Sequence, residues 1–127
     1  MVPPPVPPAV LAFVSENLRS VEELQLMLVI VQSNDRWWDA RLASAELGMD
    51  EVTARRALDH LASLNLLDIR ITGDVRYQFK PGSDQIAQLA RDCLAAYRSN
   101  PIALFTAVQR SRQGIRDFAD AFRLRRK

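Results

Sequence analysis

The chain has few of the residue types on which catalysis and metal binding depend. Among its 127 residues there is one cysteine, Cys93, and one histidine, His60. A single cysteine excludes an internal disulfide and a thiolate metal cluster. No serine or cysteine is placed to form a nucleophile pair with His60. The sequence therefore predicts a protein that is not an enzyme and that holds no metal or cofactor.

Glycine and long apolar runs are equally scarce. The four glycines are scattered at Gly48, Gly73, Gly82 and Gly114. No glycine-rich loop of the kind that holds phosphates can therefore form. The longest apolar run, residues 26–31, is far shorter than the roughly 20 residues that a bilayer span requires, and the start lacks the order of a signal peptide. We therefore expect a cytoplasmic protein with no membrane partner.

Charge is distributed unevenly, although the net charge of +2 is too small to identify a partner. Residues 107–127 carry seven Lys and Arg against two acidic residues, whereas the rest of the chain has a small acidic excess. A basic tail of this kind attracts phosphate, acidic protein surface or anionic lipid without distinguishing them.

Apolar periodicity and capping residues divide the chain into helices. Helices are predicted over residues 9–18, 21–32, 40–47 and 51–64. Ser20 is an expected N-cap that forms a capping box with Glu23, and Asp39 and Asp50 are expected to cap the third and fourth helices. Gly48 ends the third helix because glycine adopts the left-handed conformation that a helix stop requires.

After Asn65, a residue that tolerates positive φ, the apolar period changes from 3.6 to 2. Apolar residues alternate with polar ones at Leu67, Ile69, Ile71, Val75, Tyr77 and Phe79. This pattern predicts a short two-stranded hairpin with one apolar face and a turn at residues 72–74. Further helices are predicted from Ser83 or Asp84 and from Pro101, and an amphipathic stretch after Gly114.

Two adjacent tryptophans lie in an extended segment between the second and third helices. Successive side chains of an extended chain point in opposite directions. We therefore expect one of Trp37 and Trp38 to close the core and the other to lie over the hairpin.

The resulting order is helix, short strand, helix, glycine turn, helix, hairpin, which is the order of a winged helix-turn-helix. We predict a mainly α fold with a small β-hairpin wing. Residues 1–8, of which five are proline, form an extended arm. Residues 9–81 form the winged helix-turn-helix domain, and residues 82–127 form a C-terminal helical extension with a basic tail.

A family resemblance supports this reading. The stretch from Arg36 to Phe79, RWWDARLASAELGMDEVTARRALDHLASLNLLDIRITGDVRYQF, resembles MarR-like and related bacterial winged-helix regulators. The wider pattern, with its paired tryptophans, is similar to a set of small bacterial winged-helix proteins. The resemblance covers about a third of the chain.

The resemblance implies that residues 51–64 are the recognition helix and residues 72–74 the wing tip. It implies DNA contacts from Arg41, Thr53, Arg55, Arg56, Arg70, Arg76 and Lys80. Arg55 or Arg56 would donate two hydrogen bonds to guanine, and the wing residues would meet phosphates. We therefore expect a transcriptional regulator, or a DNA-associated protein, that binds duplex DNA.

The charge of this region keeps a second interpretation open. Between residues 36 and 80 there are seven Lys and Arg against seven acidic residues. Asp50, Glu51 and Asp74 are unfavourably placed for an approach to phosphate. The alternative is a winged-helix module that binds another protein and not DNA, which an exposed apolar patch would favour.

A homodimer is also expected, from a surplus of apolar helical residues after the wing. These residues are Ile102, Leu104, Phe105, Phe118 and Phe122. They exceed what the core of a three-helix winged domain requires, so we expect the C-terminal helices to form the dimer interface.

Overall fold

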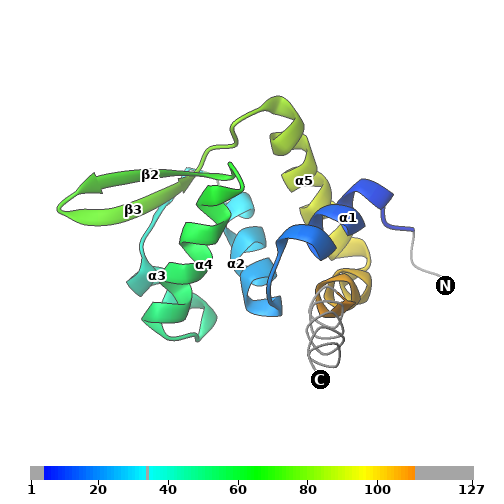
Figure 1. The fold of residues 1–127 in the computed structure, drawn as a ribbon, viewed down its shortest axis with the longest axis horizontal. Coiled ribbons are helices and arrows are strands. Elements are labelled where there is room, and N and C mark those ends of the chain that lie inside the picture. The colour runs from blue at the N-terminus through cyan, green and yellow to red at the C-terminus, as the bar shows by residue number, and fades with distance from the viewer. Residues whose placement is uncertain (1–4, 34, 111–127) are drawn as a thin grey trace, which may run out of the picture.

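The computed structural model describes residues 5–33 and 35–110, and it is mainly helical with a small antiparallel sheet (Figure 1). The expected amphipathic stretch after Gly114, and most of the basic tail, lie outside the described residues. The elements are α1 (Pro8–Asn17), α2 (Val21–Gln32), β1 (Trp37–Trp38), α3 (Ala40–Leu47), α4 (Glu51–Ser63), β2 (Leu67–Thr72), β3 (Asp74–Phe79) and α5 (Asp84–Ser99). Residues 101–110 are also helical. Within the described residues, no helix combines the length and apolar character needed to cross a membrane.

Local capping residues set the helix boundaries, as the sequence predicts. Ser20 accepts a hydrogen bond from a backbone N–H at 3.1 Å, and Asp39 and Asp50 each accept one at 2.7 Å. Gly48 and Asn65 have φ of 67° and 64°, which is the left-handed conformation expected of them. α1 begins at Pro8, the last residue of the expected proline-rich arm, because proline is accepted in the first turn of a helix.

The expected capping box is half formed. The backbone N–H of Glu23 donates to Ser20 Oγ, but the Glu23 carboxylate accepts from the backbone N–H of Arg19 at 3.1 Å and not from Ser20. The carboxylate is thereby turned into the protein, where it also faces α4.

The sheet contains the two expected hairpin strands and also the short strand expected before the third helix, whose pairing with the hairpin was not predicted. Its order is β1-β3-β2, and all neighbours are antiparallel. The tryptophan segment forms the additional strand, because Trp37 and Trp38 pair with Gln78 and Tyr77 of β3. Trp38 is fully buried and Trp37 is half-buried, so the expectation of one inward and one outward tryptophan is confirmed.

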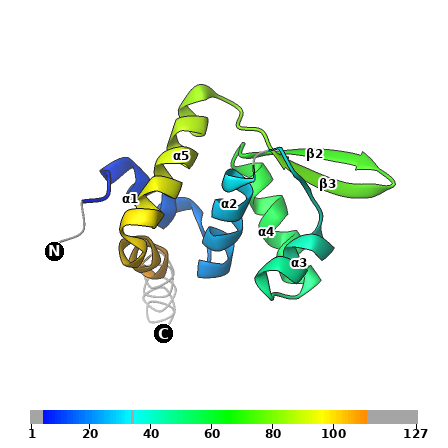
Figure 2. The same cartoon turned by 180° about the vertical axis from the view of Figure 1, so that it is seen from behind.

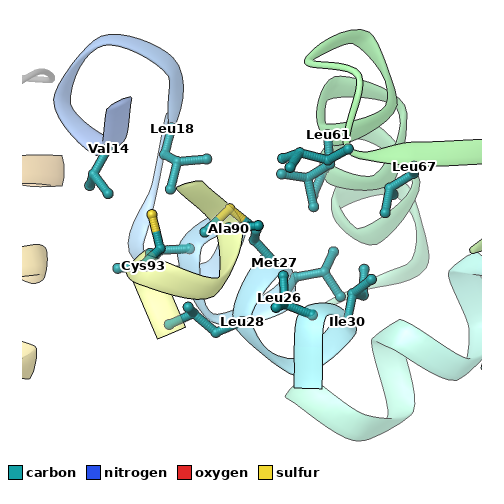
Figure 3. Close-up of a cluster of buried hydrophobic side chains, with 14 of the residues drawn as sticks. Val14, Leu18, Leu26, Met27, Leu28, Ile30, Leu61, Leu67, Ala90 and Cys93 are labelled. Carbon is teal, nitrogen blue, oxygen red and sulfur yellow. The ribbon is translucent and has the colours of Figure 1, made fainter. Parts of the chain in front are cut away.

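The core is built around α2, which is buried on most of its circumference, as its apolar residues predict (Figure 3). Leu61 of α4 approaches it from one side, and Ala90 and Cys93 of α5 approach it from the other. Cys93 is fully buried, and this burial raises the pKa of its thiol to about 12, so the cysteine is a small apolar core residue.

Of the five apolar residues that suggested a C-terminal dimer, three are described by the structure, and two of these pack inside the chain. Leu104 is fully buried, and Phe105 is half-buried with its ring edge-on to Tyr97 at a centroid distance of 5.8 Å. Only Ile102 remains exposed among the described members of the set. Phe118 and Phe122 lie outside the described residues.

The hairpin formed by β2 and β3 projects beyond the helices (Figures 1 and 2). The hairpin covers residues 67–79, as the sequence predicts, but its turn is tighter than expected, because Thr72 and Asp74 pair with each other at the ends of the strands. Its apolar face is also only partly covered. Leu67 is buried at the base of the hairpin, whereas Ile71 near the tip is 74% exposed.

Candidate nucleic-acid interface

The start of α4, the expected recognition helix, is organised by Asp50. Its carboxylate accepts from the backbone N–H of Thr53 at 2.7 Å and from the Thr53 hydroxyl at 3.0 Å. These two hydrogen bonds stabilise the charged form and lower the pKa of Asp50. Thr53 is one of the expected DNA contacts, but its hydroxyl hydrogen is already donated to Asp50 within the helix cap.

Two of the expected arginines meet the hairpin tip around a groove of about 370 Å³. The groove is lined by Asp39, Arg41, Arg55, Gly73, Asp74 and Val75, among others. Arg41 comes from the first turn of α3 and Arg55 from the second turn of α4. The groove therefore brings together the two helices of the candidate helix-turn-helix and the tip of the wing.

Arg41 forms only a weak ion pair, with Glu51, so its guanidinium group remains available to bind a ligand. Its Nε lies 3.9 Å from Glu51 Oε1, and the two side chains are 89% and 61% exposed. An ion pair this exposed is screened by water and salt and contributes little to holding Arg41 in place. Arg56 is also exposed, but it does not line the groove, because the next residue along a helix points about 100° away.

The other expected wing contacts lie on the opposite face of the hairpin. Arg70 and Arg76 are directly paired across β2 and β3, and they share their face with Trp37. The Arg70 guanidinium lies over the Trp37 ring, 4.8 Å from its centroid. This outer face points away from Tyr77, which faces α4. Lys80 is exposed just after β3, where its backbone N–H bonds to Leu66 O at the base of the hairpin.

The structure therefore divides the seven expected contact residues. Arg41 and Arg55 share one groove, Arg70 and Arg76 share the outer face of the hairpin, and the remaining three do not line the groove. Periodicity places each residue on a face of its own element, but it does not say how the faces of different elements are turned toward one another.

A contact that the sequence analysis missed attaches the hairpin to α4. Tyr77 is 1% exposed, and its hydroxyl donates a hydrogen bond to the Asp59 carboxylate. Burial, together with this bond to a carboxylate, raises the pKa of Tyr77 to about 12. The alternation of β3 placed Tyr77 on the inner face, and a buried tyrosine hydroxyl requires a partner, but nothing local pointed to Asp59.

A second missed contact attaches α4 to the N-terminal helices. His60 Nε2 lies 2.6 Å from the Asn17 carbonyl oxygen, to which it can only donate, and 3.4 Å from Glu23 Oε1. Glu23 is 4% exposed, and burial raises its pKa against the opposing effects of the Arg19 N–H and of His60. The lone histidine thus has a structural position between α1, α2 and α4.

Apolar side chains are exposed near the groove as well. Val52 of α4 is 62% exposed, and Ile69 and Ile71 of β2 are 43% and 74% exposed. Ile71 is paired with Val75, which lines the groove, so the inner face of the hairpin tip is apolar and open to water.

The described residues contain no group of three or more His, Cys, Asp or Glu side chains that can hold a metal ion. Comparison of the chain with protein-family models, with curated proteins and with solved structures found no match.

Proposed function

We propose that the chain is a winged helix-turn-helix protein that binds duplex DNA through α4 and the hairpin and acts as a transcriptional regulator. The order α2, β1, α3, α4, β2, β3, with the first strand paired to the last, supports the fold assignment. The tight turn at Gly48 and Met49, between the caps of α3 and α4, supports the helix-turn-helix. This role places the protein in the cytoplasm of a bacterial cell, where the chromosome lies.

The observation that carries the proposal is the groove at which Arg41, Arg55 and the hairpin tip meet. A DNA strand that passed between α4 and the wing would place its phosphates beside both guanidinium groups. Neither arginine is held in a close ion pair within the described residues, so both are available to neutralise phosphate.

Titration of the full chain with a mixed-sequence DNA duplex, followed by fluorescence anisotropy at several salt concentrations, tests this proposal. Replacing Arg41 and Arg55 by Gln should weaken binding and reduce the salt slope by about 2, because each phosphate contact contributes about 1. The matched control Arg91→Gln/Arg98→Gln removes the same charge from α5 and should change affinity much less. Absence of binding, or equal losses in the two double variants, would contradict the assignment.

A second function, docking of a partner protein without DNA binding, is favoured by the exposed Val52, Ile69 and Ile71. The equal numbers of acidic and basic residues between positions 36 and 80 also favour it. A flat DNA titration of the intact chain at low salt would select this alternative.

A further inference from the structure

β2 has an open edge. It is the outermost strand of the order β1-β3-β2, and no other strand in the described part of the chain pairs with it. Figures 1 and 2 show the hairpin extending away from the helices. An exposed edge strand presents unpaired backbone N–H and C=O groups to which another strand can bond.

The side chains along this edge are apolar on one face. Leu67, Ile69 and Ile71 point to the inner face, and the last two are 43% and 74% exposed. An isolated chain leaves Ile69 and Ile71 in water, whereas a strand added beside β2 would cover them.

The outer face of β2 carries two charges without an opposite partner. Within the hairpin, Asp68 is opposite Gln78 and Arg70 is opposite Arg76. Neither Asp68 nor Arg70 forms an ion pair with a described residue. Like charges directly across a sheet are unfavourable, so Arg70 lies in a position that a carboxylate on its other side would stabilise.

Another copy of β2 supplies that carboxylate. If two copies pair antiparallel with Ile69 opposite Ile69, then Asp68 of each copy lies opposite Arg70 of the other. In the same register Leu67 lies opposite Ile71. Shifting one strand by two residues keeps the same faces together but places Arg70 opposite Arg70 in one direction and Asp68 opposite Asp68 in the other. The charges therefore select a single register.

We propose that a second copy of this chain docks along β2 in that register, which joins the two three-stranded sheets into one continuous sheet with two-fold symmetry. The Arg70 guanidinium, which lies over Trp37 in the single chain, turns toward Asp68 of the second copy. The interface is small and the dimer is therefore weak. This interface goes beyond the proposed function, and its test involves no DNA.

Sedimentation velocity of the full chain over a wide range of protein concentration tests the proposal. The wild-type chain should pass from monomer to dimer as concentration rises. Asp68→Arg and Arg70→Asp each place like charges opposite one another twice, and each should raise the dimer Kd roughly tenfold or more. The double variant Asp68→Arg/Arg70→Asp restores opposite charges in the same register and should restore the dimer.

Two substitutions at equally exposed isoleucines distinguish a dimer interface at the β2 edge from one formed by the C-terminal helices. Ile71 and Ile102 are 74% and 73% exposed, so Lys at either position should leave the fold intact, as far-UV circular dichroism will check. Ile71→Lys should weaken the dimer and Ile102→Lys should not. A chain that stays monomeric, a dimer lost in Ile102→Lys but kept in Ile71→Lys, or a double charge variant that fails to dimerise would overturn the proposal.

Discussion

The base and the tip of the hairpin have the same alternating sequence pattern but differ in burial. At the base, Leu67 is 8% exposed, whereas toward the tip Ile69 and Ile71 on the same face of β2 are 43% and 74% exposed. α4 and β1 lie against the base, whereas the tip faces α3 and α4 only across the open groove that Arg41 and Arg55 line. Alternation therefore decides which face a residue occupies, and the neighbouring elements decide whether that face is covered.

The largest effect is expected from removing the buried side chain of Trp38 in β1. Trp38→Ala should lower the free energy of unfolding by about 3–5 kcal/mol, because it leaves a cavity where a fully buried ring packs. Trp37→Ala should cost far less, since Trp37 is half-buried and loses mainly its contact with Arg70. Urea unfolding of the two variants measures both values, and equal losses would contradict the inward and outward assignment.

A second pair of substitutions compares two positions on the same face of β2. Leu67→Ala should lower the free energy of unfolding by about 2–3 kcal/mol, because this side chain is buried beside α4. Ile71→Thr should change it by less than about 0.5 kcal/mol, because this side chain is already in water. Thermal or urea unfolding of dilute protein gives the comparison, and similar losses would mean that the tip is covered in solution.

Tyr77→Phe isolates the hydrogen bond that joins β3 to α4. We expect a loss of about 1 kcal/mol, since the ring still packs while the bond to Asp59 is lost. Tyr97→Phe is the matched control, because the Tyr97 hydroxyl has no hydrogen-bond partner among the described residues. If both variants lose the same stability, the Asp59 contact is not an anchor.

Stability should also depend on alkaline pH, an effect that is absent at neutral pH. The pKa of Tyr77 is raised from 10.0 to about 12 in the folded protein, so folding favours its neutral form. Its contribution to stability is fully present below pH 10 and is lost as the pH rises through about 12. Because Cys93 titrates in an overlapping range, the comparison is made in a Cys93→Ala background. There, Tyr77→Phe should lose stability less steeply between pH 10 and pH 12, and parallel curves would contradict the assigned pKa.

Features that depend on residues three or four apart were predictable from the sequence. Asp39, Asp50 and Gly48 act as expected because a cap is a hydrogen bond, or a backbone angle, within one turn of chain. The same dependence on distance explains why the second half of the capping box, from Glu23 to Ser20, was predicted wrongly. The Glu23 carboxylate is shared with His60, which lies 37 positions away and is brought close only by packing.

The candidate site was predictable as a set of residues but not as a surface. Arg55 was expected on an exposed face of α4, and Arg70 and Arg76 on the polar face of the hairpin. That these faces point in different directions depends on how the hairpin packs on α4 through Tyr77 and Asp59. The same limit applies to Leu104, whose burial depends on the core that it meets.

The amino-acid sequence alone determined the succession of helices and strands, their boundaries and the inward or outward side of each residue, because these follow from local hydrogen bonds and from the repeat of apolar side chains. Only the tertiary structure decided that the tryptophan segment joins the sheet, that two of the seven expected contact residues, Arg41 and Arg55, meet at one groove and that the edge of β2 stays open. Those outcomes depend on contacts between distant parts of the chain, which no local pattern encodes.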